Sequence, residues 1–379
     1  MRSALLLAVA LLPPLSGCLG HVLDDRRESA PPASATASDA PTDDSSPPGR
    51  ACTSVGEGIV ALAERAGLRP MSLVPDGDRV WLVNDETPPA TDRAPYPTPA
   101  VGAWAVTTPG GFLARSDIED FAGALVTFEG DLAYVRRGRE NLQIVLRDRT
   151  TGDERVVRTV ENASVGALVS QPSGLYWTTS SPAPSTSLFR FAGGRVSELS
   201  KDAPSSYGLI ADASDAYFLA RRGIDDDRSE LRLEALPIAG GEARVVYRIG
   251  DDPRFEWSLI GTSADEIFVA VRGTQLEPSS IRAIAKDGSR QRIVVRVGAF
   301  ATQPVLEGDL LTWIDGDTGR SILQTTLVGG TVTRFETSND GRRLASVGID
   351  RCNVYWTAVG EMRTGGATIY AKARGQAAR

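Results

Sequence analysis

Short runs of apolar residues, separated by glycine and polar turns, recur along most of this chain. Seven of these runs contain an aromatic residue, and a glycine turn follows each one about twenty residues later. The six intervals between the aromatic residues average about 46 residues, near the length of one blade of a β-propeller. The seven aromatic residues are Trp81, Tyr134, Trp177, Phe218, Phe268, Trp313 and Trp356.

The unit from Tyr207 to Gly250 shows the pattern inside one repeat. A first apolar run ends at Ser214-Asp215, and a second run ends in a polar stretch from Gly223 to Glu230. An alternating run follows, then the pair Gly240-Gly241, then a fourth run. Alternation predicts strands, and paired glycines favour the tight turn of a hairpin. Each unit is therefore predicted to form four short antiparallel strands.

A single sheet of four short strands cannot bury both of its faces, whereas seven such sheets stacked around an axis can. The sequence therefore predicts an all-β fold, a seven-bladed β-propeller over residues 51–379. We expect the repeated aromatic rings to wedge between neighbouring blades. In the unit of Trp313 the polar residue Asp309 stands four positions before the aromatic residue instead of three, which predicts a local bulge there.

The last unit ends before a fourth strand is complete, because only four residues follow Arg374-Gly375. The segment Gly58–Arg65 is a strand-like run that precedes the first unit and has no other partner. We expect it to complete the last blade and so to close the ring, which removes two open sheet edges. The alternative is a short helix over Val60–Ala66.

The start of the chain has the pattern of a secretory signal. Arg2 is followed by an apolar stretch, Ala4–Leu15, which is too short to span a bilayer. It ends in Leu15-Ser16-Gly17-Cys18, which resembles the lipobox of bacterial lipoproteins. The resemblance implies that residues 1–17 are a signal peptide and that Cys18 carries the lipid. The alternative is an ordinary cleaved signal with an incidental cysteine.

Residue Leu19 bears on which membrane would hold the anchor. In Gram-negative lipoproteins an aspartate at that position resembles a signal for inner-membrane retention, so its absence favours the outer membrane. From residue 18 to residue 50, Pro, Ser, Ala, Thr and Asp dominate, and large apolar residues become rare. Such a segment cannot bury enough surface to fold. It is predicted to be a disordered tether between the lipid and the propeller.

Charge and cysteine content narrow the functional classes further. The net charge of −7 and the sequence pI of about 5.1 argue against a nucleic-acid partner, which requires a basic surface. With Cys18 assigned to lipidation, Cys52 and Cys352 remain in an oxidising compartment. A disulfide bond between them would lock the ring at its seam, and the alternative is two free thiols.

The single histidine, His21, lies three residues beyond the predicted anchor. A Ser-His-Asp or Cys-His site in the propeller is therefore impossible, and so are histidine metal sites. Carboxylate chemistry remains. Asp225-Asp226-Asp227 and Asp315–Gly319 offer oxygen ligands for calcium. We interpret the first as a solvated loop and the second as a tight polar hairpin, and expect no cofactor, with calcium left open.

A binding face is expected where the connections are longest, at the end of the blades with the second-to-third strand loops. The longest of these loops, Asn84–Ala100, contains five prolines, which stiffen a presented surface. Candidate binding residues on this face are Tyr96, Phe121, Tyr207, Arg254, Trp257 and Phe300. The alternative is that the aromatic residues among them only fill gaps between blades.

The blade period and turn placement resemble the propellers of bacterial lipoproteins and of TolB-like and WD-repeat proteins. The resemblance covers residues 51–379 in architecture alone, because the repeats lack the Gly-His and Trp-Asp dipeptides of WD repeats. It implies a docking role. We therefore expect an envelope propeller that binds a protein, peptide or glycan without catalysis. The alternative function is a carboxylate-dependent, calcium-assisted hydrolase or lyase that acts on envelope polysaccharide.

Overall fold

The fold is taken from a computed structural model of the chain. It describes residues 53–56, 58–87, 100–108, 110–180, 186–203, 208–223, 229–250, 256–273, 278–298, 300–338, 341–360 and 366–374. The chain divides into two units, Met1–Ser45 and Ser46–Arg379, and every described residue belongs to the second. The predicted signal peptide, the tether and the predicted lipid site Cys18 lie outside the described residues.

The secondary structure of the described residues consists of 28 strands in seven four-stranded antiparallel sheets. Blade I has β2 (Pro70–Asp76), β3 (Arg79–Asp85), β4 (Val101–Thr107) and β5 (Ala114–Arg115). Blade II has β6 (Phe121–Phe128), β7 (Asp131–Arg137), β8 (Asn141–Arg147) and β9 (Glu154–Glu161). Blade III has β10 (Ser164–Gln171), β11 (Gly174–Ser180), β12 (Thr186–Ala192) and β13 (Arg195–Ala203).

The remaining blades follow the same order from the centre outward. Blade IV has β14 (Leu209–Ala211), β15 (Asp215–Gly223), β16 (Ser229–Pro237) and β17 (Arg244–Gly250). Blade V has β18 (Glu256–Thr262), β19 (Glu266–Arg272), β20 (Ser280–Ala285) and β21 (Gln291–Arg296). Blade VI has β22 (Thr302–Glu307), β23 (Leu310–Ile314), β24 (Ser321–Thr326) and β25 (Thr333–Thr337). Blade VII has β26 (Arg343–Ile349), β27 (Asn353–Val359), β28 (Gly366–Ala373) and β1 (Ile59–Ala66).

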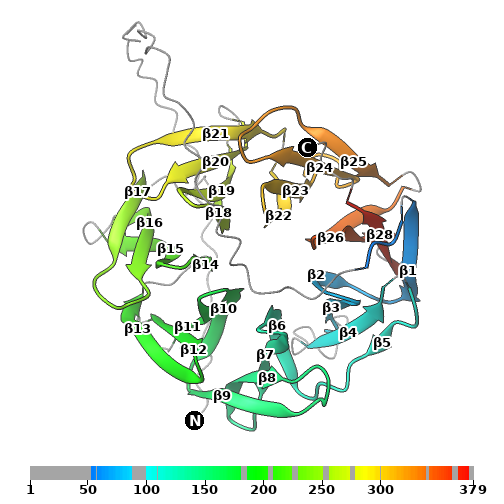
Figure 1. The fold of residues 1–379 in the computed structure, drawn as a ribbon, viewed down its shortest axis with the longest axis horizontal. Coiled ribbons are helices and arrows are strands. Elements are labelled where there is room, and N and C mark those ends of the chain that lie inside the picture. Colours follow the sequence, from blue (N-terminus) through cyan, green and yellow to red (C-terminus); the bar gives the residue numbers. More distant parts are fainter. Residues whose placement is uncertain are drawn as a thin grey trace, which may run out of the picture. The chain divides into compact units, whose positions relative to one another are not determined.

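The seven sheets stand in a ring, with the first strand of each blade nearest the centre (Figure 1). This confirms the predicted seven-bladed propeller. It also confirms the predicted closure, because β1 pairs antiparallel with β28 and becomes the outermost strand of blade VII. The alternative of a helix over Val60–Ala66 is wrong, since those residues belong to β1.

Because neighbouring strands of a blade run in opposite directions, the connections between strands gather at two opposite ends of the blade. We call the end with the first-to-second and third-to-fourth strand turns the turn face. The opposite end, with the second-to-third strand loops and the connections between blades, is the loop face. The first-to-second strand turn of blade IV lies between Asp212 and Asp215, as the sequence predicts, and corresponding turns lie at Gly77 between β2 and β3 and at Gly308 between β22 and β23.

The core is divided into seven apolar clusters, and each cluster joins two neighbouring blades. The cluster of Trp177, for example, combines Leu175 and Phe189 of blade III with Ile144 and Leu146 of blade II. All seven repeated aromatic residues lie on the second strand of their blade and are buried in clusters of this kind. The interpretation that they wedge between blades is confirmed, and burial of such rings is a main source of stability.

Most innermost strands share a local irregularity near their loop-face ends, whereas in blade V it lies between Leu259 and Gly261, nearer the turn face. The pairing of the first strand with the second shifts register in six blades, and in blade VI the shift lies between Thr302 and Val305. Near Asp309 the pairing of β22 with β23 is regular, with Glu307 opposite Leu310. The bulge expected at that turn is therefore wrong. The turn has two residues, like the one between β6 and β7, so that Leu310 and not Asp309 holds the position three before the aromatic residue. The register shift lies at the other end of the strand.

The seam of the ring is held by the side chain of Asn353, which is buried at the start of β27. Its amide oxygen accepts a hydrogen bond from the Val55 backbone N–H at 3.0 Å, and its amide nitrogen donates to the Thr53 carbonyl at 2.8 Å. The backbone N–H of Ala373 also donates to the carbonyl of Gly56 at 3.3 Å. These bonds fix the segment that leads into β1 against the turn face of blade VII.

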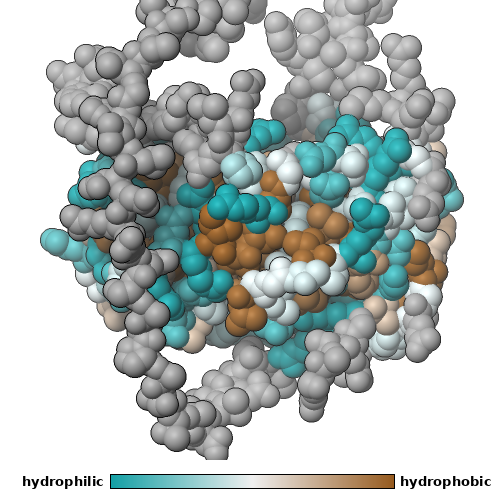
Figure 2. Space-filling view, turned by 90° about the horizontal axis from the view of Figure 1, so that it is seen from above, coloured by the Kyte–Doolittle hydropathy of each residue, from teal (hydrophilic) through white to brown (hydrophobic). Residues whose placement is uncertain are grey.

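The outer rim of the propeller is mixed in character. Figure 2 views the molecule edge-on and shows apolar side chains gathered among polar ones on this rim. The outermost strands expose single large apolar residues, namely Ile59 on β1, Val156 on β9, Val245 on β17 and Ile293 on β21. Polar neighbours on such edges discourage pairing with other chains.

Candidate functional site

The candidate binding residues fall on different seams of the ring. Tyr96, Tyr207 and Arg254 lie outside the described residues. Phe121 begins β6 and is buried in the cluster between blades I and II, where its ring centroid lies 6.1 Å from that of Tyr134. Trp257 on β18 and Phe300 before β22 pack against two other clusters. The structure does not bring these three rings into one surface.

Trp257 and Phe300 are each half-buried beside a guanidinium group. Trp257 stacks on Tyr247 with 6.2 Å between ring centroids, and the Arg282 guanidinium lies 5.7 Å from its ring. The Arg272 guanidinium lies 5.6 Å from the ring of Phe300. The indole N–H of Trp257 is buried without a hydrogen-bond acceptor. Packing explains most of this arrangement, and a binding role for these residues stays a prediction.

A cavity of about 310 Å³ opens on the loop face of blade I, and we call it the loop-face cavity. It lies between the connection from β1 to β2 and the first residues of the longest predicted loop. Its lining residues are Arg65, Ala66, Gly67, Leu68, Arg69, Asn84, Asp85, Glu86, Thr87 and Trp104. The lining therefore combines an aromatic ring, two arginines and two carboxylates.

Trp104 on β4 organises the wall of the loop-face cavity. Its indole N–H donates to Oε1 of Glu86 at 2.9 Å, and Arg115 donates to both oxygens of the same carboxylate at 3.2 and 3.0 Å. The guanidinium carbon of Arg65, on the closing strand β1, lies 4.1 Å from the Trp104 ring centroid. This distance suits a cation–π contact. The wall is preformed because each polar group already has a partner.

The electrostatics of the loop-face cavity favour ionised carboxylates. Burial raises the pKa of Glu86, but hydrogen bonds from Arg115 and Trp104 outweigh burial, so that the net pKa is lowered. The pKa of Asp85 is also lowered, chiefly by hydrogen bonding with Thr87. At neutral pH both groups are anions that can orient a ligand, and neither holds a proton to donate as a general acid.

Sequence reasoning identified the loop that starts at Asn84 but missed Trp104, Arg65 and Glu86. The available signal was that Trp104 is a second tryptophan of its unit and lies outside the repeated aromatic position. Arg65 gave no signal, because it reaches Trp104 only once β1 has closed the ring.

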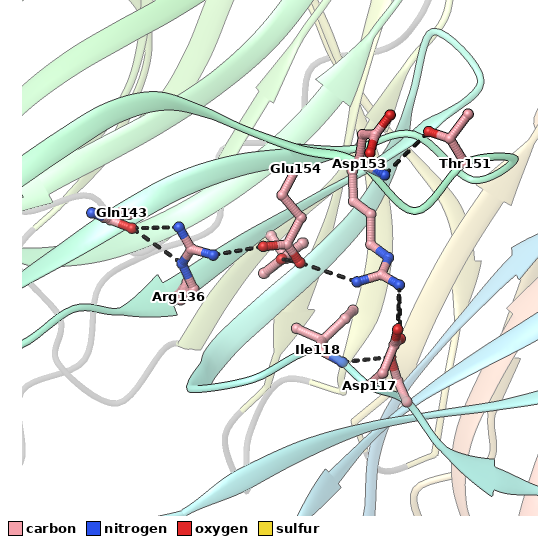
Figure 3. Close-up of polar contacts among 10 residues, drawn as sticks. Asp117, Ile118, Arg136, Gln143, Thr151, Asp153 and Glu154 are labelled. Carbon is pink, nitrogen blue, oxygen red and sulfur yellow. Dashed lines mark hydrogen bonds and ion pairs between the residues drawn. The ribbon is translucent and has the colours of Figure 1, made fainter.

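A second cavity, of about 300 Å³, lies on the turn face at the seam between blades I and II, and we call it the turn-face cavity. Its lining residues are Arg79, Trp81, Asp117, Leu132, Arg147, Arg149, Thr150, Thr151 and Gly152. Arg147 donates to Glu154 at 3.1 Å and to both oxygens of Asp117 at 2.8 and 2.7 Å (Figure 3). Arginine thus forms a large part of this wall.

Glu154 is a shared acceptor behind this wall. Arg136 donates to its Oε2 at 2.6 Å, and the Tyr134 hydroxyl donates to its Oε1 at 2.5 Å (Figure 3). Burial and the neighbouring Glu154 carboxylate raise the pKa of Tyr134 well above its usual range. The hydrogen bond and charge of Arg147 lower the pKa of Asp117 despite a small opposing effect of burial. At neutral pH Asp117 is therefore an anion, and the Tyr134 hydroxyl keeps its proton.

The predicted calcium ligands have different outcomes. Asp225-Asp226-Asp227 lies outside the described residues. Asp315 accepts hydrogen bonds from the Asp317 N–H at 3.2 Å and from the Thr318 hydroxyl at 2.9 Å, and this closes the turn between β23 and β24. The tight-hairpin interpretation of Asp315–Gly319 is confirmed. Within the described ranges no group of three or more His, Cys, Asp or Glu residues is arranged to hold a metal ion.

Nothing in the described part of the chain forms a helix that is long and apolar enough to cross a bilayer. The predicted disulfide pairs Cys352 with Cys52, and Cys52 lies outside the described residues. Cys352 lies in the turn between β26 and β27, directly before Asn353. Its backbone N–H donates to the Asp350 carboxylate at 2.7 Å.

Comparison with known proteins establishes the fold alone. No protein-family model matches the chain, and no curated protein matches it. The β-propeller domain of the Trilobed protease from Pyrococcus furiosus, described as having an open velcro topology, matches with a TM-score of 0.58 and 11% identity over 81% of this chain and 97% of that one. In the present chain β1 closes the ring instead.

Two further solved structures are similar to the chain. An oligogalacturonate lyase solved in complex with manganese matches with a TM-score of 0.56 and 13% identity over 84% of this chain and 98% of that one. TolB from Acinetobacter baumannii matches with a TM-score of 0.43 and 12% identity over 71% of this chain and 59% of that one. Propellers of this kind serve hydrolases, lyases and other proteins, so function must be argued from the sites.

Proposed function

We propose that this protein is a lipid-anchored β-propeller of a bacterial cell envelope that binds a protein, peptide or glycan partner without catalysing its conversion. The observation that carries the proposal is the loop-face cavity, where Trp104 offers an aromatic wall and Arg69, Asp85 and Glu86 offer fixed charges. Preformed pockets that combine an aromatic surface with a few oriented polar groups are typical of binding sites.

The chemistry of the chain favours binding over catalysis. The propeller contains no histidine, since His21 is the only one in the chain. The carboxylates of both cavities with a resolved shift, Asp85, Glu86 and Asp117, have lowered pKa values and arginine neighbours. Such groups are poor proton donors near neutral pH. They are suited to hold an orientation or a charge.

The experiment that tests the proposal uses the full chain in detergent micelles as bait for envelope extracts. We expect a specific partner to be retained by the wild type and by Arg195→Glu, a control on the exposed start of β13. Arg69→Glu should reduce retention about tenfold, because it places a carboxylate beside Asp85 and Glu86. Equal retention by all three proteins, or conversion of a polysaccharide by the chain, would contradict the proposal.

The alternative function, a carboxylate-dependent hydrolase or lyase, has one observation in its favour. Among the described carboxyl groups with a resolved shift, Glu307 is the one whose pKa is raised, because burial outweighs the nearby Arg374 and Arg351. A raised pKa suits a carboxyl group to act as a general acid. Release of sugar products from envelope polysaccharide by the wild type, lost in Glu307→Gln, would favour this alternative, and a calcium-dependent rise in Tm would add the ion.

The proposal also includes a lipid anchor at Cys18 and a disulfide bond at the seam of the ring. Lipidation of Cys18 in the outer membrane is tested by incorporation of a labelled fatty acid, which Cys18→Ser should abolish. We further propose that Cys52 and Cys352 form a disulfide bond. One observation supports it: Asn353, directly after Cys352, binds the backbone of Thr53, which directly follows Cys52.

A further inference from the structure

The turn-face cavity lies at the opposite end of the blades from the loop-face cavity and has no part in the proposed function. It is formed where the turn between β8 and β9 of blade II meets the start of β3 in blade I. Three of its nine lining residues are arginines, Arg79, Arg147 and Arg149. Guanidinium groups match the planar fork of carboxylates and the oxygens of phosphates. What the cavity can bind depends on which of these arginines are already held in ion pairs.

Arg149 forms the fixed floor of the cavity. Its guanidinium makes an ion pair with Asp76, and both side chains are only 6% exposed. The second oxygen of Asp76 accepts a hydrogen bond from the Trp81 indole N–H at 3.3 Å. Removing one partner from a buried ion pair is strongly destabilising. Arg149 therefore stays with Asp76 and shapes the site without being free to exchange partners.

Arg147 is held differently on its two sides. Its side chain is 15% exposed, and the inner nitrogen pairs with Glu154 in the network with Arg136 and Tyr134. The outer nitrogen holds the carboxylate of Asp117, whose side chain is 77% exposed. This pair is open to solvent on its Asp117 side, and ion pairs screened by solvent contribute little net free energy. The outer pair can therefore be exchanged for a ligand while the inner pair keeps the guanidinium in place.

The turn beside Arg147 leaves space for this exchange. Gly152 has a φ of +78°, and a Cβ atom at that position would lie 3.3 Å from the outer nitrogen of Arg147. The backbone N–H groups of Thr150 and Thr151 both donate to the Asp148 carboxylate, at 2.7 and 2.8 Å. These backbone N–H groups already have an acceptor, so only the arginines can donate hydrogen bonds to a ligand here.

Arg79 completes the arrangement from the other blade. It is exposed at the start of β3 and lines the same cavity, and no ion pair to it is formed by the described residues. We propose that the turn-face cavity binds one oxyanion group of a small ligand, a carboxylate or a phosphate, between Arg79 and the outer nitrogen of Arg147. In the absence of ligand the carboxylate of Asp117 occupies this position, so Asp117 is an internal competitor.

The volume limits the ligand to a small acid. About 300 Å³ is at the lower end of the range for ligand pockets, enough for a single acidic sugar or a phosphorylated small molecule. Trp81 and Leu132 provide an apolar wall beside the arginines. This site does not depend on the loop-face cavity, so its failure would leave the proposed function standing.

The test is calorimetric titration of the full chain in detergent micelles with glucuronate, inorganic phosphate and, as the neutral control, glucose. Asp117→Asn removes the competitor and should tighten anion binding roughly threefold, the effect of one exposed ion pair. Arg79→Gln should weaken binding about fivefold or more, because it removes a charge-assisted donor. Arg195→Gln, on the exposed start of β13, is the matched control and should change nothing.

The outcomes separate the possible sources of the anion. Preference for glucuronate supports a carboxylate ligand, and preference for phosphate supports a phosphorylated one. Each preference supports the proposal only when the Asp117→Asn and Arg79→Gln effects have opposite signs. The proposal is overturned if neither the wild type nor Asp117→Asn binds either anion saturably. It is also overturned if all variants bind equally or if glucose binds as well as the anions.

Discussion

The second strands of blades III and VII share a sequence motif, but their fourth strands come from different places along the chain. Both contain Tyr-Trp-Thr, as Tyr176-Trp177-Thr178 on β11 and Tyr355-Trp356-Thr357 on β27. Trp177 stacks on Phe189 with ring centroids 5.7 Å apart, and Trp356 stacks on Tyr370 at 5.6 Å. In each pair the two residues are opposite each other on neighbouring strands.

The threonine of each motif accepts a hydrogen bond from the innermost strand of its blade. The hydroxyl of Thr178 accepts from the Ala167 N–H at 3.2 Å, and that of Thr357 accepts from the Ser346 N–H at 3.1 Å. Ala167 and Ser346 lie at the register shifts of β10 and β26, where a backbone N–H loses its strand partner. A side-chain acceptor there avoids the cost of a buried unpaired donor.

The turns show how the two blades differ. In blade III the Tyr176 hydroxyl lies 2.8 Å from the hydroxyl of Ser173, and β13 follows β12 directly along the chain. In blade VII the Tyr355 hydroxyl donates to Asp350 at 2.9 Å and accepts from Asn353 at 2.9 Å. Asn353 then holds the segment before β1. The two blades therefore share one apolar arrangement. Blade VII has additional polar bonds because its outer strand comes from a distant part of the chain.

The largest expected effect is loss of the repeated tryptophan. Trp177→Ala and Trp356→Ala should each lower the free energy of unfolding by about 3–5 kcal/mol, because both rings are buried between blades. Denaturant titration measures this. Phe112→Ala, at a residue that is 87% exposed, is the control and should stay within about 0.5 kcal/mol. A loss as small as that of the control would contradict the wedge interpretation.

Reduction of the proposed Cys52–Cys352 bond should distinguish blade VII from blade III. We expect dithiothreitol to lower the free energy of unfolding of the wild type by about 2–4 kcal/mol, because the bond closes a very long loop. Cys352→Ser should already show this loss and respond no further. Mass spectrometry without reductant should detect the linked peptide, and two alkylatable thiols would exclude the bond.

Removing the Asn353 side chain should loosen the seam more than the corresponding change in blade III. Asn353→Ala is expected to cost about 1–3 kcal/mol, because two backbone groups and the Tyr355 hydroxyl lose a buried partner. Hydrogen exchange should quicken in β1 and stay unchanged in β13. Ser173→Ala is the matched change in the turn of blade III. Faster exchange in β13 with Asn353→Ala would show that the effect is not local.

The tyrosines of the two copies predict the response to alkaline pH. Burial raises the pKa of Tyr176, and burial together with the Asp350 carboxylate raises that of Tyr355. The folded state therefore keeps its phenolic protons at a pH where the unfolded chain, with a tyrosine pKa of about 10, loses them. Their contribution to stability is complete below about pH 10 and falls above it, by up to roughly 1.4 kcal/mol per pH unit for each tyrosine.

Single replacements separate the two tyrosines. Tyr176→Phe and Tyr355→Phe should each make the fall in stability between pH 10 and 11 shallower than in the wild type. Denaturant titration at several pH values measures the slope. An unchanged slope in both variants would show that other groups control the alkaline transition, of which Tyr134 and Tyr217 are the first candidates because their pKa values are also raised.

The smallest expected effect belongs to the shared threonines. Thr178→Val and Thr357→Val should each cost about 1 kcal/mol, because valine keeps the shape but leaves one backbone N–H without an acceptor. Thr302→Val, at an exposed position, is the control. If the losses in the two blades differ widely, the copies are not equivalent, and the bond from Ser346 to Thr357 is the first reason to examine.

The sequence predicted the fold better than the sites because the fold depends on local repetition. The spacing of Trp81 and its six counterparts, together with turns such as Ser214-Asp215 and Gly240-Gly241, predicted the number of blades and their strands. The two cavities join residues that have no local relation. Arg65 meets Trp104 across the closed seam, and Arg79 meets Arg147 across two blades. No periodicity connects such pairs, so a single sequence gives no signal for them.

The apolar repeats are enough to specify seven small sheets and a closing strand within Gly58–Arg65, because a sheet with two apolar faces must be covered on both sides. Which charged groups meet depends on the folded ring. Glu86 is paired with Arg115 and its side chain is 23% exposed, whereas Asp117 is paired with Arg147 and its side chain is 77% exposed. Apolar burial needs only the correct pattern, whereas an ion pair needs two groups at one position in space.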